Sequence, residues 1–340
     1  MLTQIRFENF TAFKKLDLEL SPGINILIGT NGTGKTHALK AAYAACAIAG
    51  GKGHIGEKLV SCFLPLEGSI GRLVHREGPG RSGGSLEVWR KKNHRLRIYQ
   101  STVMDDARQA RVIMDDVWKK VSIECAYIPV KEMLANAPGF SSLYKERAIH
   151  FEEVYADIID RAYSPAIRGP RSKERQKLLE ILQKQLGGWI ETRGETFFWK
   201  RSEGPVLEFT LLAEGFRKLG LLWLLIQNGT LWNGSVLFWD EPEANLNPAL
   251  MRTVARILHF LQRYGVQMIL ATHSLAFLKE LQLLQEKEDN LKYHALYRDK
   301  NDIIQVESSD DYLDLCSNAI SEAMDDLFDR TMAHSLGGRR

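Results

Sequence analysis

The chain has 340 residues, 44% of them apolar and 26% charged, which is ordinary for one large or two small globular domains. Its net charge of +3 is too small to imply nucleic-acid binding by itself. The longest apolar run, 219–226, is interrupted by Gly220 and is too short to cross a bilayer, and the N-terminus lacks an apolar signal region. From these features we expect a cytoplasmic protein and not a membrane protein. Four scattered cysteines without a CxxC pair favour reduced, mostly buried thiols: Cys46, Cys62, Cys125 and Cys316.

In chain order, short alternating or β-branched apolar runs predict strands over 5–10, 15–20, 24–28, 123–129, 196–200, 206–209, 236–239 and 266–271, and a hairpin over 293–306. Composition and apolar spacing predict helices over 35–48, 107–120, 144–163, 173–190, 215–227, 248–264, 277–287 and 310–330. The last of these is acidic and amphipathic and is followed by a basic tail. The pattern is that of an α/β protein.

The charged helices 144–163 and 173–190 are separated by a Pro- and Gly-containing break at 164–171. We therefore expect a short helical hairpin inserted between two α/β halves. The predicted division is 1–140, 141–191 and 192–340. The insert is too short for a long coiled-coil arm and is interpreted as a compact lid or docking surface.

A locally basic stretch between 72 and 97 carries eight basic residues against two acidic ones, Glu77 and Glu87. One interpretation is a phosphate-backbone surface for DNA or RNA. The other is a solvated hairpin whose charges protect an exposed sheet edge. The second is favoured, because Trp89 is the one aromatic residue there placed to stack on bases.

The segment 29–36 reads GTNGTGKT and fits the phosphate-loop pattern G-x-x-x-x-G-K-[ST] without a mismatch. A predicted strand precedes it and a predicted helix follows, which is the context the motif needs. Backbone N–H groups of such a loop surround phosphate oxygens, and the helix N-terminus adds partial positive charge. We expect Lys35 to reach the β- and γ-phosphates and the Thr36 hydroxyl to ligate Mg²⁺. The nucleotide-binding residues predicted here are Asn31, Gly32, Thr33, Gly34, Lys35 and Thr36.

Two further segments place polar residues at strand ends. Asp240 and Glu241 follow the apolar run 236–239, at the carboxyl end of a buried strand where ligands bind in parallel sheets. Asp240 is placed to hold Mg²⁺, and Glu241 to polarise an attacking water. His273 ends the next buried strand and is interpreted either as a γ-phosphate contact or as a satisfied core histidine.

Together the loop, Asp240-Glu241, the turn 242–248 and His273 resemble the Walker A, Walker B, D-loop and switch histidine of an ABC-type ATPase head. The opening segment 5–10 is similar to the first strand of the SMC, RecF and OLD-type branch. Within that branch the chain looks most like ATPase subunits of bacterial phage-defence systems of the PARIS, Septu and Gabija type. The resemblance covers 1–60 and 205–280 and implies a P-loop fold with a mixed sheet.

The resemblance also implies a homodimer, with higher oligomers possible, that buries two ATP molecules between subunits. Each would be held by one phosphate loop and capped by the other subunit's signature segment, here 212–218. Gly215 would meet the γ-phosphate. Ala213 stands where the family usually has a serine, which predicts slow turnover. No convincing Q-loop glutamine is present, although Lys131 and Glu132 lie near its expected place.

We therefore expect an ATP-binding and ATP-hydrolysing switch that uses Mg²⁺, with Lys35, Glu241 and His273 as catalytic residues. No nuclease signature is present, so the switch would control a separate nuclease or toxin as the sensor of a defence complex. One alternative is a DNA-repair or chromosome-maintenance ATPase that binds duplex DNA through 72–97. Another is a scaffold that binds ATP to assemble and barely hydrolyses it.

Overall fold

A mixed six-stranded sheet forms the centre of the fold in the computed structural model, which describes residues 1–76, 78, 80–91, 93–146, 149–169, 172–316 and 319–337. Its order is β14-β13-β3-β12-β11-β7, and only β14 runs antiparallel to its neighbour. The strands are β3 (Ile24–Ile28), β7 (Cys125–Ile128), β11 (Val236–Asp240), β12 (Gln267–Thr272), β13 (Leu291–Arg298) and β14 (Ile304–Ser309). Every residue of β3, β11 and β12 is buried, as expected for parallel strands covered on both faces.

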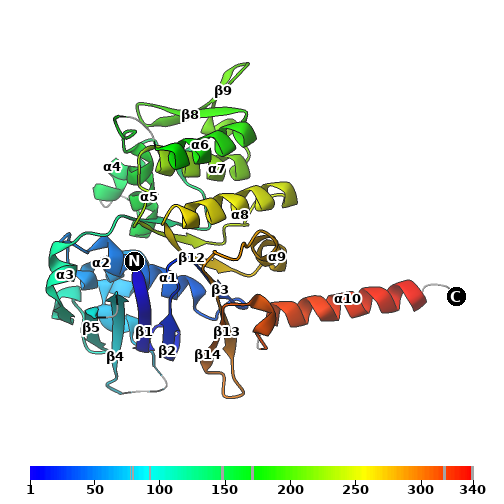
Figure 1. The fold of residues 1–340 in the computed structure, drawn as a ribbon. Coiled ribbons are helices and arrows are strands. Elements are labelled where there is room, and N and C mark those ends of the chain that lie inside the picture. The colour runs from blue at the N-terminus through cyan, green and yellow to red at the C-terminus, as the bar shows by residue number, and fades with distance from the viewer. Residues whose placement is uncertain are drawn as a thin grey trace.

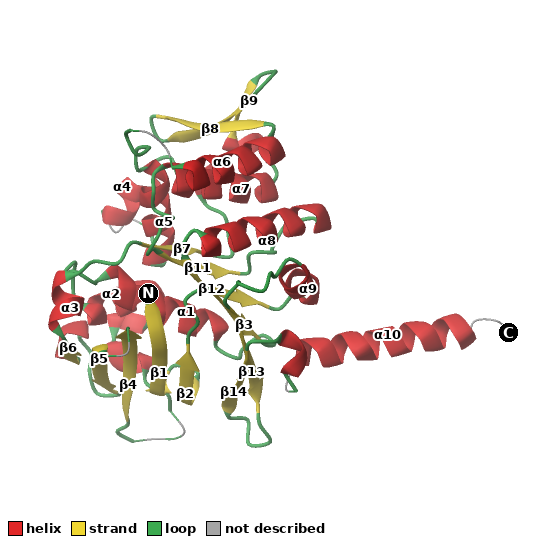
Figure 2. Cartoon of the chain, viewed as in Figure 1, coloured by secondary structure: helices red, strands yellow, loops and turns green. Residues whose placement is uncertain are grey.

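A second, five-stranded antiparallel sheet in the order β2-β1-β4-β5-β6 covers one side of the centre (Figure 2). Its strands are β1 (Leu2–Phe10), β2 (Phe13–Glu19), β4 (Gly83–Arg90), β5 (His94–Ser101) and β6 (Arg111–Met114). Alternation puts apolar residues such as Ile5 and Phe7 inside and charged residues such as Arg6 on the outer face.

Helix α1 (Lys35–Ala47) lies between the two sheets, and its side chains share one core with both. Because sheets approach it from two sides, Ala38, Ala41, Ala42, Ala44 and Ala45 are all buried. Small side chains let both sheets come close to the helix axis. The alanine-rich composition of this segment is therefore a packing requirement as well as a helix signal.

The opposite face of the central sheet packs against helices and carries the second core (Figure 1). These helices are α5 (Glu153–Tyr163), α6 (Lys173–Leu186), α7 (Glu214–Gln227), α8 (Pro248–Arg263) and α9 (Leu275–Leu283). A small antiparallel sheet caps the upper end, formed by β8 (Gly188–Arg193), β9 (Thr196–Arg201) and β10 (Val206–Glu208). The remaining helices are α2 (Ile55–Phe63), α3 (Asp116–Lys120), α4 (Phe140–Lys145) and α10 (Ala319–Gly337), the last of which projects away from the body (Figure 1). No described helix has both the length and the apolar character that a membrane span requires.

The α/β class with a mixed sheet is confirmed, and so are most predicted strands, but several helix predictions are wrong. The expected helix 107–120 is divided into a short 3-10 turn, strand β6 and α3, because β6 pairs with β5. The first arm of the expected hairpin is broken, since α4 ends at Lys145 and α5 begins at Glu153. The second arm ends early at Gly187, whose left-handed backbone (φ 66°) closes α6 before β8 begins. Both α5 and α6 pack against α7, so they do not form a free hairpin.

Other differences are local. Helix α2 is absent from the predicted helices. The C-terminal helix begins at Ala319, after a 3-10 turn capped by Asp311, and not at 310. Cys46, Cys62 and Cys125 are buried free thiols, as expected, whereas Cys316 is exposed. Of the predicted break 164–171, residues 170 and 171 lie outside the described part of the chain.

Candidate functional site

The carboxyl ends of three neighbouring parallel strands define the candidate site. β12 pairs with β3 on one side and with β11 on the other, so Thr272 lies beside Ile28 and Asp240 beside Ala271. The phosphate loop follows β3, Asp240 ends β11 and His273 follows β12. The pairing therefore brings the three sequence-predicted segments to one edge of the sheet.

The phosphate loop turns directly into the N-terminus of α1. Gly34 has a left-handed backbone (φ 84°), and a β-carbon there would lie 2.5 Å from the Phe13 ring, so glycine is required on both grounds. Lys35 is buried, and its ammonium donates to the carbonyl oxygens of Gly29 (2.6 Å) and Thr30 (2.9 Å). Burial lowers the pKa of Lys35, while the nearby Asp240 carboxylate opposes that change. The ammonium is thus held on the loop by weak acceptors that an anionic phosphate would replace.

Thr36 and Asp240 form the second part of the site. The Thr36 hydroxyl donates to Asp240 Oδ2 at 2.7 Å, and the Tyr127 hydroxyl reaches the same oxygen at 3.4 Å. Burial raises the pKa of Asp240, and the Thr36 bond opposes this. A hydroxyl and a carboxylate side by side are oxygen donors of the kind that Mg²⁺ takes beside nucleotide phosphates, so the residues fit that ion. The described residues hold no cluster of three or more His, Cys, Asp or Glu side chains able to bind a metal, so phosphate and water oxygens would complete the shell.

Glu241 and His273 form the third part. His273 Nδ1 lies 2.9 Å from Glu241 Oε1, and the two side chains are 48% and 25% exposed. Glu241 has a left-handed backbone (φ 48°), which is costly for a residue with a side chain, and its N–H donates to the Ala271 carbonyl at 2.8 Å. This turn directs the carboxylate out of the strand and toward the phosphate loop.

An open cavity of about 200 Å³ lies between these parts. Its lining consists of Ala12, Asn31, Gly32, Gly34, Lys35, Thr36, His37, Asp240 and Glu241. Burial and Lys40 lower the pKa of His37 to about 4, so this ring is neutral at pH 7 and the cationic charge comes from Lys35. Of the predicted residues, Thr33 is buried and bonds to the Thr30 carbonyl.

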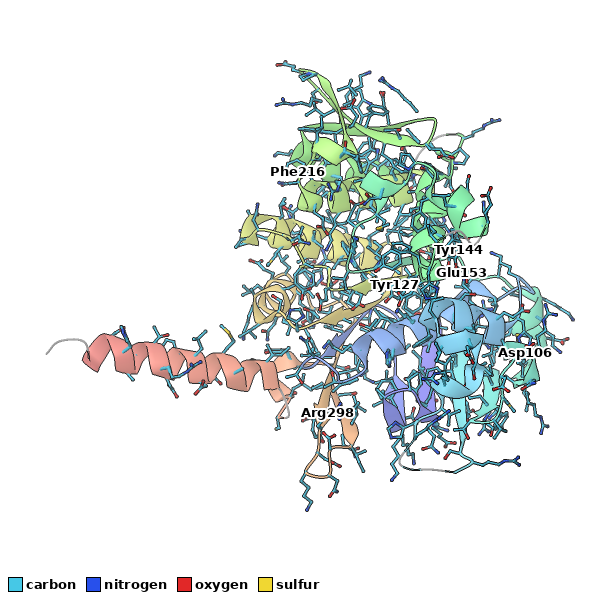
Figure 3. All side chains as sticks on the ribbon, turned by 180° about the vertical axis from the view of Figure 1, so that it is seen from behind. Asp106, Tyr127, Tyr144, Glu153, Phe216 and Arg298 are labelled. Carbon is cyan, nitrogen blue, oxygen red and sulfur yellow. The ribbon has the colours of Figure 1, made fainter. Side chains whose placement is uncertain are left out.

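Three predicted residues do not line this cavity: Thr33, His273 and Gly215. Thr33 belongs to the loop itself and His273 contacts Glu241, whereas Gly215 lies on another element. It lies in the first turn of α7, where a β-carbon would come within 3.0 Å of the Asn245 carbonyl oxygen. Figure 3 shows Phe216, its neighbour, in the upper half of the molecule and Arg298 in the lower half. Ala213 precedes the helix without a side-chain cap, so the N-terminal N–H groups of α7 are not capped by a hydroxyl.

Two charged residues make contacts that the sequence did not predict. Glu132, expected near the Q-loop position, has a buried side chain that pairs with Arg217 of α7. Arg298 of β13 donates to the Gly32 carbonyl at 3.0 Å and pairs with Asp302, so it braces the phosphate loop from outside. Because Arg298 lies 266 residues from Gly32 along the chain, no local sequence signal predicts this contact.

The part of the basic stretch 72–97 that lies in β4 and β5 belongs to the interior of the five-stranded sheet and not to its edge. Arg95 and Arg97 pair with Glu87, while Arg90 is buried, lies over the Trp118 ring and donates to the Val121 carbonyl. The predicted hairpin is confirmed, but protection of a sheet edge is the wrong explanation of the charges on β4 and β5. Glu77 and Lys92 of the stretch lie outside the described residues.

The comparisons with known proteins agree with this geometry. Residues 119–279 match the family described as "AAA domain, putative AbiEii toxin, Type IV TA system", and residues 4–46 match a second AAA domain family. The DNA replication and repair protein RecF of Salinibacter ruber is 30% identical over 215 residues, which are 48% of this chain and 52% of that protein. RecF of Klebsiella pneumoniae is 48% identical over 42 residues, 12% of each. The match thus spans about half the length of the Salinibacter ruber protein and a much smaller part of the Klebsiella pneumoniae one.

Two solved structures share the fold. An SMC head bound to the C-winged helix domain of ScpA has a TM-score of 0.59 at 13% identity, covering 91% of this chain and 97% of that chain. The Pyrococcus furiosus SMC head with an extended coiled coil, bound to the C-terminal domain of ScpA, has a TM-score of 0.56 at 11% identity and covers 97% and 99%. The molecule is a P-loop protein with the mixed-sheet fold of SMC ATPase heads. Parts of its sequence match AAA-domain family models and RecF proteins, and its similarity to SMC heads is one of fold.

Replacing Lys35 by alanine is expected to weaken ATP binding at least about tenfold, because the loop loses its buried ammonium. Isothermal titration calorimetry with ATP and Mg²⁺ measures the effect. Lys52 is an exposed lysine shortly after α1, so Lys52→Ala is the matched control and should bind ATP with the affinity of the wild type. Equal affinity in the Lys35 variant would contradict the assignment of this loop.

Proposed function

We propose that this protein binds ATP with Mg²⁺ and hydrolyses it slowly, with Glu241 polarising the attacking water. The observation that carries the proposal is the convergence of Lys35, Thr36, Asp240 and Glu241 on one cavity. Phosphoryl transfer depends mainly on charge neutralisation and on a positioned water, and these four side chains supply both. Mg²⁺, held by Thr36 and Asp240, would neutralise charge on the phosphates.

The proposal includes a homodimer closed by ATP. Within one chain, the N-terminus of α7 does not line the cavity, yet its N–H groups are uncapped by any side chain. A helix N-terminus is an anion site when a phosphate reaches it, and a second copy would bring one. Ala213 provides no hydroxyl there, which is the basis for expecting slow turnover.

For biological role, we propose the regulatory subunit of a defence complex that controls a separate nuclease or toxin. The AAA family matched by residues 119–279 carries a toxin description, and this supports the proposal. Projecting helix α10 offers a surface for such a partner, since Met324, Leu327, Phe328 and Met332 are all exposed.

A RecF-like role in DNA repair is the second candidate, favoured by the RecF matches.

Glu241→Gln is expected to lower the ATP turnover number at least about a hundredfold while leaving ATP affinity within about threefold. The amide keeps the shape of the side chain but cannot act as a base. Phosphate release at saturating ATP measures the turnover number. A Glu241→Gln variant that hydrolyses ATP as fast as the wild type would overturn the proposed role, and would favour an ATP-dependent scaffold.

Purifying tagged Glu241→Gln with ATP from cells that carry its native gene neighbourhood separates the two biological roles. We expect a stoichiometric second protein, identified by mass, that is absent when Lys35→Ala is the bait. Nucleic acid alone, released by high salt, would instead support direct DNA binding. In that event Arg95→Glu and Arg111→Glu, on the outer sheet face, test the contact surface better than buried Arg90.

A further inference from the structure

Glu243, two residues beyond Glu241, is a buried acid that the proposed chemistry does not use. Its Oε1 accepts from the Thr272 hydroxyl at 2.6 Å and faces the His273 N–H at 3.4 Å. Its Oε2 is buried and has no hydrogen-bond partner among the described residues. A half-satisfied buried carboxyl costs free energy, so a gain elsewhere must offset it.

The contact joins the turn after β11 to the end of β12. The Ala244 N–H donates to the Glu241 carbonyl at 3.0 Å, so Glu241 and Glu243 belong to one tight turn that points them in different directions. Thr272 is fully buried, and its hydroxyl also accepts from the Ser274 N–H at 3.0 Å, at the start of α9. Glu243 therefore fixes the backbone on both sides of His273.

Lys218 of α7 holds the same turn from the other side. It is 1% exposed, and its ammonium donates to the Ala244 carbonyl at 2.7 Å. Its charge faces the carboxyls of Glu132, Glu214, Glu241 and Glu243. Burial lowers the pKa of Lys218, and these four acids oppose the change. A shared countercharge of this kind lets several carboxyls lie together in a buried place.

We propose that Glu243 is a positioning residue that, through Thr272 and the His273 backbone, holds the His273 ring against Glu241. The His273 side chain is 48% exposed, so packing alone does not fix its ring. Its orientation depends on its backbone and on the 2.9 Å contact with Glu241. The inference rests on the proposed hydrolytic role of Glu241 and His273, and it assigns no contact between Glu243 and substrate.

Glu243→Ala and Thr272→Val are each expected to lower the turnover number about tenfold or more, with the ATP Michaelis constant within about threefold. The double variant should be no slower than the slower single variant, because both remove one contact. Thr272→Ser, which restores the hydroxyl, should recover most of the rate. Thr230→Val removes another buried threonine hydroxyl, outside the site, and controls for general effects of that change.

A second measurement tests the position of the His273 ring without measuring ATP hydrolysis. In nucleotide-free protein labelled with ¹⁵N-histidine, the His273 ring signals are assigned by comparison with His273→Gln. Glu243→Ala and Thr272→Val should both move them toward the values of a free, exposed imidazole, while Thr272→Ser and Thr230→Val should not. Unchanged His273 signals in folded Glu243→Ala would overturn the positioning role even if Glu241 proves catalytic. Shifted signals in a protein whose wild type does not hydrolyse ATP would uphold the contact and reject the proposed function.

Discussion

The parallel pairing of β3, β12 and β11 is the constraint on which the site depends. Residues of the phosphate loop and Asp240 are separated by about two hundred positions in sequence, yet Thr36 and Asp240 share a 2.7 Å hydrogen bond. Only the register of these strands places their carboxyl ends together. A slip of one residue would turn buried apolar side chains toward the wrong core and move Asp240 away from Thr36.

The two hydrophobic cores hold the strands in that register. One face of the central sheet packs on α1 and the antiparallel sheet, and the other on α5 to α9. The turn after β11 is then held from three directions, by Lys218 of α7, by Thr272 of β12 and by the packing of Gly215 on Asn245. Helix α7 is thus tied to the turn that carries Glu241. Direct contacts therefore run from α7 through this turn to the Glu241–His273 pair.

Local signals predicted much of this arrangement from the sequence. The phosphate loop, Asp240-Glu241 and the strands before them are encoded in short runs of residues, so their elements were predicted correctly. The prediction of one helix over 107–120 was wrong, because the pairing of β6 with β5 overrides the local helix preference. Contacts such as Glu132–Arg217, Lys218–Ala244 and Arg298–Gly32 join distant segments through side chains. No spacing in the sequence encodes them, so they required the structure.

We propose above that ATP closes two copies of this chain into a dimer. Sedimentation velocity of Glu241→Gln measures it most directly, in three conditions: without nucleotide, with ADP and Mg²⁺, and with ATP and Mg²⁺. We expect a dimer only with ATP and Mg²⁺, a monomer in the other two conditions, and no dimer for Lys35→Ala with ATP and Mg²⁺. A single sedimentation coefficient in all three conditions, from protein shown to bind ATP, would contradict it.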